Sequence, residues 1–270
     1  MGRVLGLATA TLVAVVGCTG VVYAPASQAA EDPVLPTANA KWDYQIGKPY
    51  DPRDGVTLVS RDRTEAPLAD GYTMCYINAY QTQPDAAKWW KNNHDDLLLK
   101  KDGGGYVVDS YWGEILFDIS TADKRDELAG IINGWITGCA DDGFGAIEPD
   151  NLDSWTRSGG RLTRDQAFAY AKLIIDRAHA AGLAIGQKNA AGQTQQGTAA
   201  GFDFAVAEEC GRYRECSAYT ADYADQVYVI EYRSQDFKYS CQRWGDELSI
   251  ILRDRKVTAP GSKSYVYRSC

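Results

Sequence analysis

The sequence predicts a single-domain (β/α)8 barrel, an α/β fold in which eight parallel strands alternate with helices. Short runs rich in β-formers alternate along the chain with longer segments of helical composition, which is typical of βα units around a parallel sheet. Eight such runs occur between residues 42 and 254, which fits a closed barrel. An open doubly wound sheet would carry a glycine fingerprint after its first strand, where Gly47-Lys48-Pro49 stands instead.

The eight expected strands share β-branched and aromatic residues, and most of them end at polar side chains. They span Trp42–Ile46, Val56–Asp62, Tyr72–Asn78, Ala146–Asp150, Ala184–Lys188, Asp203–Glu208, Gln226–Glu231 and Leu248–Asp254.

The clearest expected helices are Thr121–Ala140 and Thr163–Ala181. The second should begin with Thr163 as its N-cap, carry Asp165 in its first turn and end before Gly182. The segment 86–120 has no simple periodicity. We expect it to be an irregular insertion after the third strand that forms one wall of the site.

The N-terminus has the order of a secretory signal peptide. A single basic residue, Arg3, precedes an apolar stretch from Val4 to Ala24 and then small residues before Glu31. We therefore expect a signal peptide over 1–30, a short lead-in over 31–40, a barrel domain over 41–270, and a secreted protein without an integral membrane span. A membrane anchor is disfavoured because no basic stop-transfer cluster follows. The alternative is a lipid anchor at the cell surface through Cys18, which follows a lipobox-like Val15-Val16-Gly17.

Six cysteines remain beyond the leader, an even number that suits a disulfide framework in an oxidising compartment. Buried free thiols are the alternative. The pair closest in sequence, Cys210 and Cys216, is the first disulfide to expect. No spacing matches a zinc ribbon or a redox C-x-x-C motif.

The formal net charge of −8 disfavours nucleic acid and anionic lipid as partners, because both are polyanions. It is compatible with a cationic substrate, although solubility alone also explains such a charge.

Carboxylates and amides follow the expected strands at the edge where a barrel places its active site. Glycoside cleavage needs two carboxyl groups flanking the scissile bond, one as nucleophile or base and one as acid. A loop or helix-capping set is the competing interpretation of the fourth strand's end. The polar strand-end residues are Asp62, Asn78, Glu148, Asp150, Asn151, Asp153, Lys188, Asn189, Glu208, Glu209, Glu231 and Tyr232.

Histidine occurs only at His94 and His179, which argues against a Ser-His-Asp triad or a multi-histidine metal site. The remaining possibility is acid–base catalysis by carboxyl groups, without a metal or a cofactor. Aromatic residues on expected rim loops suit sugar stacking, notably Tyr111-Trp112, Trp155 and Tyr232.

Several segments together resemble glycoside hydrolase family 114, the endo-α-1,4-polygalactosaminidases. The similarity runs from about Trp42 to about Asp254. It rests on Trp112-Gly113-Glu114 with Asp118, Glu148-Pro149-Asp150-Asn151-Leu152-Asp153, Lys188-Asn189, Glu208-Glu209-Cys210 with Cys216, and Glu231-Tyr232.

The resemblance implies a cofactor-independent barrel that cleaves α-1,4-linked galactosamine polymers with retention. It points to Asp150 as nucleophile and Glu208 as general acid/base, an order that could be reversed. The implied substrate-binding and pKa-setting residues are Asp62, Trp112, Glu148, Asn151, Asp153, Lys188, Asn189, Glu209, Glu231 and Tyr232.

The chain also departs from the family pattern. Where the family usually has a turn of small residues that includes an acid, this chain has Asn78-Ala79-Tyr80. Ala207 stands where the family commonly has asparagine. These changes concern substrate selectivity rather than the catalytic pair. The remaining alternatives are a barrel hydrolase for another α-linked polysaccharide and a non-catalytic carbohydrate-binding barrel.

Overall fold

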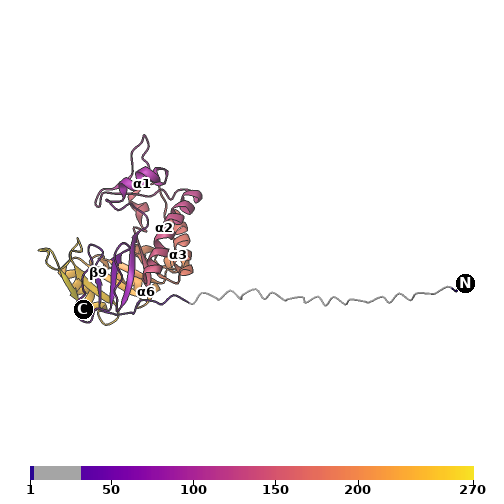
Figure 1. Ribbon diagram of the computed structural model, residues 1–270. Coiled ribbons are helices and arrows are strands. Elements are labelled where there is room, and N and C mark those ends of the chain that lie inside the picture. Colours follow the sequence, from indigo (N-terminus) through magenta and orange to yellow (C-terminus); the bar gives the residue numbers. More distant parts are fainter. Residues whose placement is uncertain (3–31) are drawn as a thin grey trace.

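The computed structural model describes residues 1–2 and 32–270 of the chain. Cys18 and all but the first two residues of the expected signal peptide fall within 3–31 and so lie outside the described residues. The rest forms a sheet curved into a nearly closed barrel, with helices packed on its outside (Figure 1). The sequence prediction of an α/β barrel is confirmed.

All eight expected strands form, and each pairs in parallel with its neighbours in the order in which they occur along the chain. Their ends agree with the expected ends to within two residues. The observed strands are β1 (Trp42–Tyr44), β2 (Leu58–Asp62), β3 (Tyr72–Asn78), β6 (Ala146–Asp150), β7 (Ala184–Lys188), β8 (Phe204–Glu208), β9 (Val227–Glu231) and β10 (Ser249–Arg253).

A ninth strand, β11 (Tyr267–Ser269), was not expected and pairs antiparallel with β10. In the described chain no backbone ladder joins β10 to β1, and side chains connect these two strands instead. The Arg253 guanidinium donates to Asp43 Oδ1 at 2.7 Å and also to the carbonyl of Tyr44. Both Arg253 and Asp43 are fully buried, so an ion pair helps to close the barrel.

Helices follow β3, β6, β7, β8 and β9, whereas β10 leads to another strand. The links β1–β2 and β2–β3 contain no helix in the described chain, contrary to the expected alternation. The two clearest expected helices form, and Thr163 accepts the expected N-cap hydrogen bond. Thr121 caps the other helix in the same way. The helices outside the insertion are α2 (Ala122–Asp142), α3 (Arg164–Ala180), α4 (Thr194–Ala200), α5 (Cys210–Tyr213), α6 (Cys216–Tyr223) and α7 (Ser234–Trp244).

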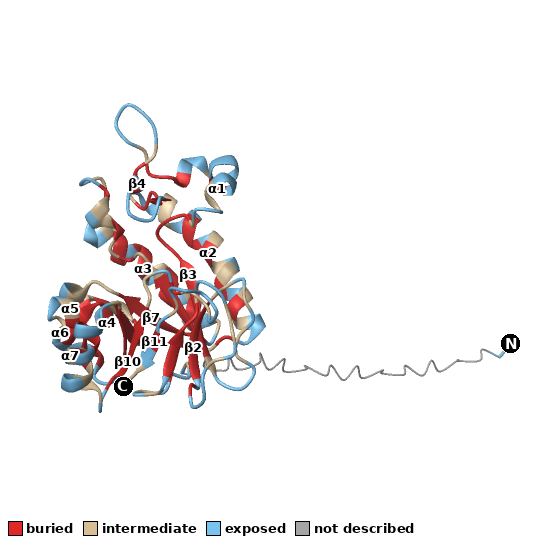
Figure 2. Cartoon of the chain, turned by 90° about the vertical axis from the view of Figure 1, so that its left-hand side faces the viewer, coloured by how far each residue is buried: buried red, intermediate tan, exposed pale blue. Residues whose placement is uncertain are grey.

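The insertion after β3 is more ordered than the sequence indicates. It contains α1 (Ala87–Asn93) and a small antiparallel hairpin of β4 (Val108–Asp109) and β5 (Glu114–Ile115). Trp90 and Phe117 pack at 4.3 Å between ring centroids, and both belong to the large apolar cluster that continues between the sheet and the helices. It projects above the barrel with an exposed loop at its tip (Figure 2).

Two apolar cores lie on opposite sides of the sheet, because successive side chains on a strand point to opposite faces. One fills the lower barrel interior and includes Trp42, Leu58, Phe204 and Tyr228. The other, larger one lies between the sheet and the helices. In Figure 2 the strands and the inward faces of α2 and α3 are buried, and the outer faces of the helices are exposed.

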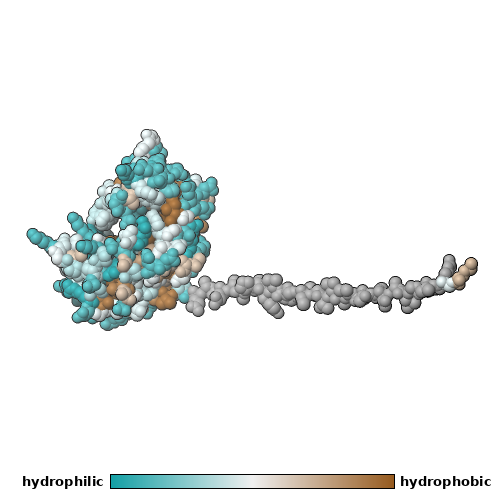
Figure 3. Space-filling view, in the orientation of Figure 1, coloured by the Kyte–Doolittle hydropathy of each residue, from teal (hydrophilic) through white to brown (hydrophobic). Residues whose placement is uncertain are grey.

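The six cysteines beyond the leader form three disulfides, Cys75–Cys139, Cys210–Cys216 and Cys241–Cys270. The expected local pair is therefore confirmed, and free thiols are excluded for these six. Across the described residues, no helix combines the length and the apolar character needed to span a bilayer. The face shown in Figure 3 is mostly hydrophilic, with small separate hydrophobic patches.

Candidate active site

A cavity of about 860 Å³ opens at the carboxyl ends of the parallel strands. Its floor comes from the strand ends, and its walls come from the insertion hairpin and the loops after β6, β7, β8 and β10. This is the end of the barrel at which the sequence predicts the site.

Strand alternation directs the central side chains into the barrel. On β6, Glu148 and Asp150 share the face of Ala146, which belongs to the interior core. By the same period of two, Lys188 on β7 and Glu208 on β8 also point inward. These four charged groups therefore converge above the apolar core.

Lys188 lies at the centre of this convergence. Its Nζ atom is 2.9 Å from Glu148 Oε1, 3.2 Å from Asp150 Oδ1 and 3.6 Å from Glu208 Oε2. The side chain is only 1% exposed, so water screens these interactions weakly. Although burial favours the neutral amine, the three carboxylates outweigh it and hold the pKa of Lys188 well above its usual value.

Asp150 is held as a carboxylate. Its Oδ2 accepts a hydrogen bond from Tyr76 at 2.7 Å, and its Oδ1 accepts one from the backbone N–H of Asn151 at 2.9 Å. Burial acts to raise the pKa of Asp150, but Lys188 and these two donors outweigh it and lower the pKa below its ordinary value. An ionised carboxylate facing a cavity is suited to nucleophilic attack.

Glu208 is oriented by two different donors. The Asn189 amide donates to Oε2 at 3.0 Å, and the Tyr232 hydroxyl donates to Oε1. Asn189 also accepts the backbone N–H of Glu208 at 2.8 Å, which fixes the two strand ends relative to each other. The Glu208 side chain is 27% exposed, so its carboxyl group is accessible from the cavity.

Glu148 lies beneath the cavity and is fully buried. Tyr44 donates to its Oε1 at 2.9 Å, and Ser60 donates to its Oε2. Together with Lys188, these donors satisfy both carboxylate oxygens. Glu148 therefore holds Lys188 in place from below and does not line the cavity.

The residues just after these strands adopt left-handed backbone conformations. Asn151, Asn189 and Glu209 have φ values of 69°, 55° and 59°. Asparagine tolerates this region better than other non-glycine residues, whereas for Glu209 it is strained. The turn at Asn151 lets its N–H point back at Asp150, and the turn at Glu209 is held by its ion pairs.

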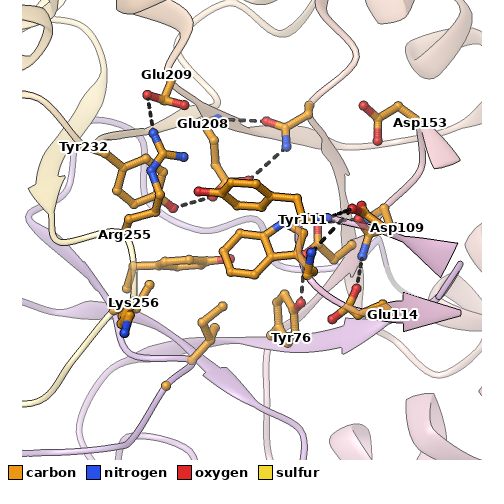
Figure 4. A pocket seen from close by; sticks show the side chains of 18 of the residues that line it. Tyr76, Asp109, Tyr111, Glu114, Asp153, Glu208, Glu209, Tyr232, Arg255 and Lys256 are labelled. Atoms are coloured by element: carbon orange, nitrogen blue, oxygen red, sulfur yellow. Dashed lines mark hydrogen bonds and ion pairs between the residues drawn. The ribbon is translucent and has the colours of Figure 1, made fainter. Parts of the chain in front are cut away.

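One wall of the cavity, here called the acidic wall, consists of Asp109, Glu114 and Asp153. Arg157 bridges Asp109 and Asp153 at 2.9 and 3.0 Å. Glu114 accepts amide hydrogen bonds only through Oε2, from Asn78 and Gln81 and, at 3.4 Å, from Asn151. Burial raises the pKa of Glu114 above its ordinary value. In Figure 4 the three acids lie together on one side of the pocket.

The opposite wall, here called the basic wall, carries Arg255 and Lys256 from the loop after β10 (Figure 4). Arg255 pairs with Glu209 at 2.9 Å and stacks 4.8 Å from the Tyr232 ring centroid. Lys256 makes no ion pair with any residue in 32–270. Apolar Ile46 and Val257 line the cavity in the same region.

Exposed aromatic rings stand at the mouth of the cavity. Tyr111 and Trp112, in the turn between β4 and β5, are 66% and 51% exposed and pack edge to face. Tyr213 on α5 is 58% exposed. Flat exposed rings on a polar cavity are suited to stacking on sugar rings rather than to core packing.

Most of the residues expected at the site surround this cavity, and three take other places. Asp62 accepts from Gln83 at 2.8 Å and does not line the cavity. Glu231 points to the opposite face of the sheet, where it is buried against α5 and α7 and accepts from Gly211 N and Ser240 Oγ. The third is Glu148, described above. The residues that line the cavity are Trp112, Asp150, Asn151, Asp153, Asn189, Glu208, Glu209 and Tyr232, and Lys188 contacts two of them from below.

Sequence reasoning missed several functional neighbours. Tyr44, Ser60 and Tyr76 donate hydrogen bonds to Glu148 and Asp150. The alternation of side chains along a strand places all three on the inward face, so it could have identified them. Asp109 lies on the two-residue strand β4 of the insertion and Arg255 on the loop after β10, and neither segment has a periodicity that would place a side chain.

One cluster has the composition of a metal site, with Cys210, Cys216 and Glu231 close together. The two sulfurs are bonded to each other, so they cannot serve as thiolate ligands. This cluster therefore does not fit a metal ion.

Comparison with known structures finds the same barrel fold in other proteins. Aspergillus fumigatus Ega3, solved in complex with galactosamine, superposes with a TM-score of 0.72 at 18% identity, covering 90% of this chain and all of that one. The glycoside hydrolase domain of PelA from Pseudomonas aeruginosa has a TM-score of 0.58 at 11% identity, covering 84% and 98%. At these identities the likeness establishes the fold. None of the curated proteins compared matches the chain.

The family assignment comes from the sequence as a whole. The family model described as glycoside-hydrolase family GH114 matches residues 23–270, which include every residue of the cavity. The chain therefore belongs to glycoside-hydrolase family GH114 and is a glycoside hydrolase.

Proposed function

We propose that this protein is a secreted enzyme that hydrolyses α-1,4-linked galactosamine polymers with retention of configuration. Asp150 is the nucleophile, and Glu208 is the general acid and base. The observation that carries the assignment is the sharing of one buried ammonium, Lys188, by these two carboxylates at the cavity floor.

The two carboxyl groups have environments that suit different roles. Asp150 is kept ionised by Lys188, Tyr76 and a backbone N–H, as a nucleophile must be. Glu208 is more exposed and is held by a neutral amide and a phenol, so it can take and release a proton during the reaction.

The spacing of the pair is compatible with retention. Oδ1 of Asp150 and Oε2 of Glu208 lie 3.2 and 3.6 Å from the same nitrogen, so these two oxygens are at most about 6.8 Å apart. Retaining enzymes place their carboxyl groups about 5–5.5 Å apart, and inverting enzymes leave about 6.5–9.5 Å for a water molecule, so this limit covers the retaining range and only the lower edge of the inverting range. Observation of the anomer first released, by NMR, tests this directly, and initial release of the β-anomer from an α-linkage would contradict it.

The substrate assignment rests on charge and on the related structure. Carboxylates outnumber cations among the residues that line the cavity, so an amino sugar carrying an ammonium group is attracted to it. Ega3, which shares the fold, was solved with galactosamine bound. The exposed rings of Tyr111 and Trp112 provide stacking surfaces for further sugar units.

The residue assignment is tested by reducing-end release from a partly deacetylated α-1,4-galactosamine polymer. Asp150→Asn and Glu208→Gln should each lower kcat by at least about a thousandfold, because each removes a proton-transfer or covalent step. Asp62→Asn is the matched control, since it changes a strand-end carboxylate outside the cavity. Retained activity in both catalytic variants would refute the site.

The substrate class is tested by comparing that polymer with its fully acetylated form and with a neutral α-linked galactan. We expect cleavage of the first and little of the others, because the acidic wall gains nothing from neutral sugars. Equal cleavage of all three would favour a hydrolase for another α-linked polysaccharide. Binding without cleavage of any polymer would favour a non-catalytic barrel.

Secretion is supported by the three disulfides, which persist in oxidising compartments. Mass spectrometry of the protein from culture medium should find a mature N-terminus near residue 31. A diacylated Cys18 in the membrane fraction would instead establish the lipid-anchored form.

A further inference from the structure

We infer that the two halves of the cavity accept sugar units of different charge, so that the enzyme cuts between a galactosamine and an N-acetylgalactosamine. The inference rests on the proposed function and deepens it. It follows from the placement of the acidic wall and the basic wall on opposite sides of the cavity (Figure 4).

The acidic wall is built to receive a cation. Arg157 neutralises only one of the two negative charges on Asp109 and Asp153, so these three residues together carry a net charge of −1. Glu114 is 9% exposed, has no cationic partner among the described residues and accepts hydrogen bonds only through Oε2. Its Oε1 is therefore an unused acceptor on the cavity wall. A sugar ammonium beside it would supply the missing donor and favour the ionised carboxylate.

The basic wall disfavours a cation. Glu209 is paired with both Arg212 and Arg255, so this group of three is net positive. Lys256 adds a second positive charge that no carboxylate in the described chain neutralises. An ammonium placed here is repelled, whereas an acetamide is uncharged, offers a carbonyl to Lys256 and has a methyl group that can pack on Ile46 and Val257.

The catalytic pair relates the two walls to the direction of the substrate. Asp150 precedes Asn151, which contacts Glu114 and Arg157 of the acidic side. Glu208 contacts Tyr232, on which Arg255 of the basic wall stacks. The nucleophile attacks the sugar that keeps the new reducing end, and the acid protonates the oxygen of the departing unit. The galactosamine therefore occupies the acidic side, and the N-acetylgalactosamine departs on the basic side.

The test is end-group analysis of the products from a half-acetylated α-1,4-galactosamine polymer, using mass spectrometry and NMR. New reducing ends should be mainly galactosamine, and new non-reducing ends mainly N-acetylgalactosamine. Lys256→Glu should raise the ratio of galactosamine to N-acetylgalactosamine at the new non-reducing ends about fivefold, because a repulsive contact becomes attractive. Lys263→Glu is the control, since Lys263 belongs to the same loop and does not line the cavity.

The outcomes separate this inference from the proposed function. Cleavage with the same composition at both new ends, or with the reverse composition, would overturn the assignment of the two walls and leave the hydrolase intact. An unchanged end ratio in Lys256→Glu would also overturn it. Absence of any cleavage of partly acetylated and fully deacetylated polymers would instead refute the proposed function itself.

Discussion

The ammonium nitrogen of Lys188 lies 3.2 Å from a carboxylate oxygen of Asp150, at the end of the neighbouring strand. Lys188 is buried, and Glu148 and Glu208 complete its surroundings. The arrangement places one positive charge among three negative ones at the floor of a cavity. Its stability depends on the lysine, because a buried carboxylate without a counter-charge is costly.

Replacing Lys188 by methionine should abolish hydrolysis and lower the free energy of unfolding by about 3–5 kcal/mol at pH 7.5. The loss should shrink as the pH falls, since protonation relieves the repulsion among the carboxylates that remain. Urea unfolding at pH 5 and pH 7.5 measures this. Lys172→Met, which removes an exposed ion pair with Asp176, should change the free energy by less than about 1 kcal/mol. Equal losses in the two variants would contradict the argument.

The sequence predicts most of the cavity floor. Asp150, Lys188 and Glu208 each close an expected strand, and the alternation of side chains along a strand turns all three toward the barrel interior. Applied strictly, the same alternation would also have excluded Glu231. It follows Ile230, which belongs to the barrel interior, so it must point to the outer face. The charged pair Glu231-Tyr232 at the end of β9 suggests a site residue, whereas strand alternation places Glu231 outside the barrel.

The cavity walls could not be predicted in the same way. Arg157 joins Asp109 of the insertion to Asp153 after β6 through contacts between segments that are distant in sequence. Arg255 reaches Glu209 across another such gap. Loop side chains follow no periodicity, and their positions depend on the packing of the whole barrel. The buried pair of Asp43 on β1 and Arg253 on β10 was not predicted either, because this contact forms only when the first and last parallel strands meet as the barrel closes.

Glu231 should make the protein more stable at acid pH. Burial raises its pKa to about 7, from an ordinary value of 4.5. Because the folded protein holds this proton more tightly than the unfolded chain, the stabilisation is complete below pH 4.5 and is lost as the pH rises through 7. The loss amounts to about 3 kcal/mol.

Glu231→Gln should remove this dependence, since glutamine keeps an acceptor for Gly211 and Ser240 but does not ionise. Thermal unfolding of the wild type and the variant between pH 4 and pH 8 checks it. The two melting temperatures should be similar at pH 4.5, and the variant should be the more stable at pH 8. Parallel curves over the whole range would show that Glu231 does not titrate in this window.

The ion pair of Asp43 and Arg253 should behave as a coupled unit. Arg253→Met leaves a buried carboxylate unpaired and should cost about 3–5 kcal/mol, whereas adding Asp43→Asn should recover part of that loss. Urea unfolding of both single variants and the double variant gives the coupling energy. Additive losses would mean that the two side chains stabilise the barrel independently.

The disulfides should separate stability from activity. Cys210–Cys216 closes a loop with a sequence separation of 6 directly after Glu208 and Glu209, and Cys241–Cys270 closes one of 29 away from the cavity. Replacing each pair by serine should cost about 2 and about 4 kcal/mol respectively, because the longer loop restricts the unfolded chain more.

Activity should follow the opposite order. Without Cys210–Cys216, the turn that holds Glu209 against Arg255 is less restrained, so kcat should fall by about a hundredfold for a displacement of the order of 1 Å. Without Cys241–Cys270, kcat should stay within twofold of the wild type at a temperature where both variants are folded. A larger loss of kcat in the second variant would show that the C-terminal strand, and not the turn after β8, controls the geometry of the site.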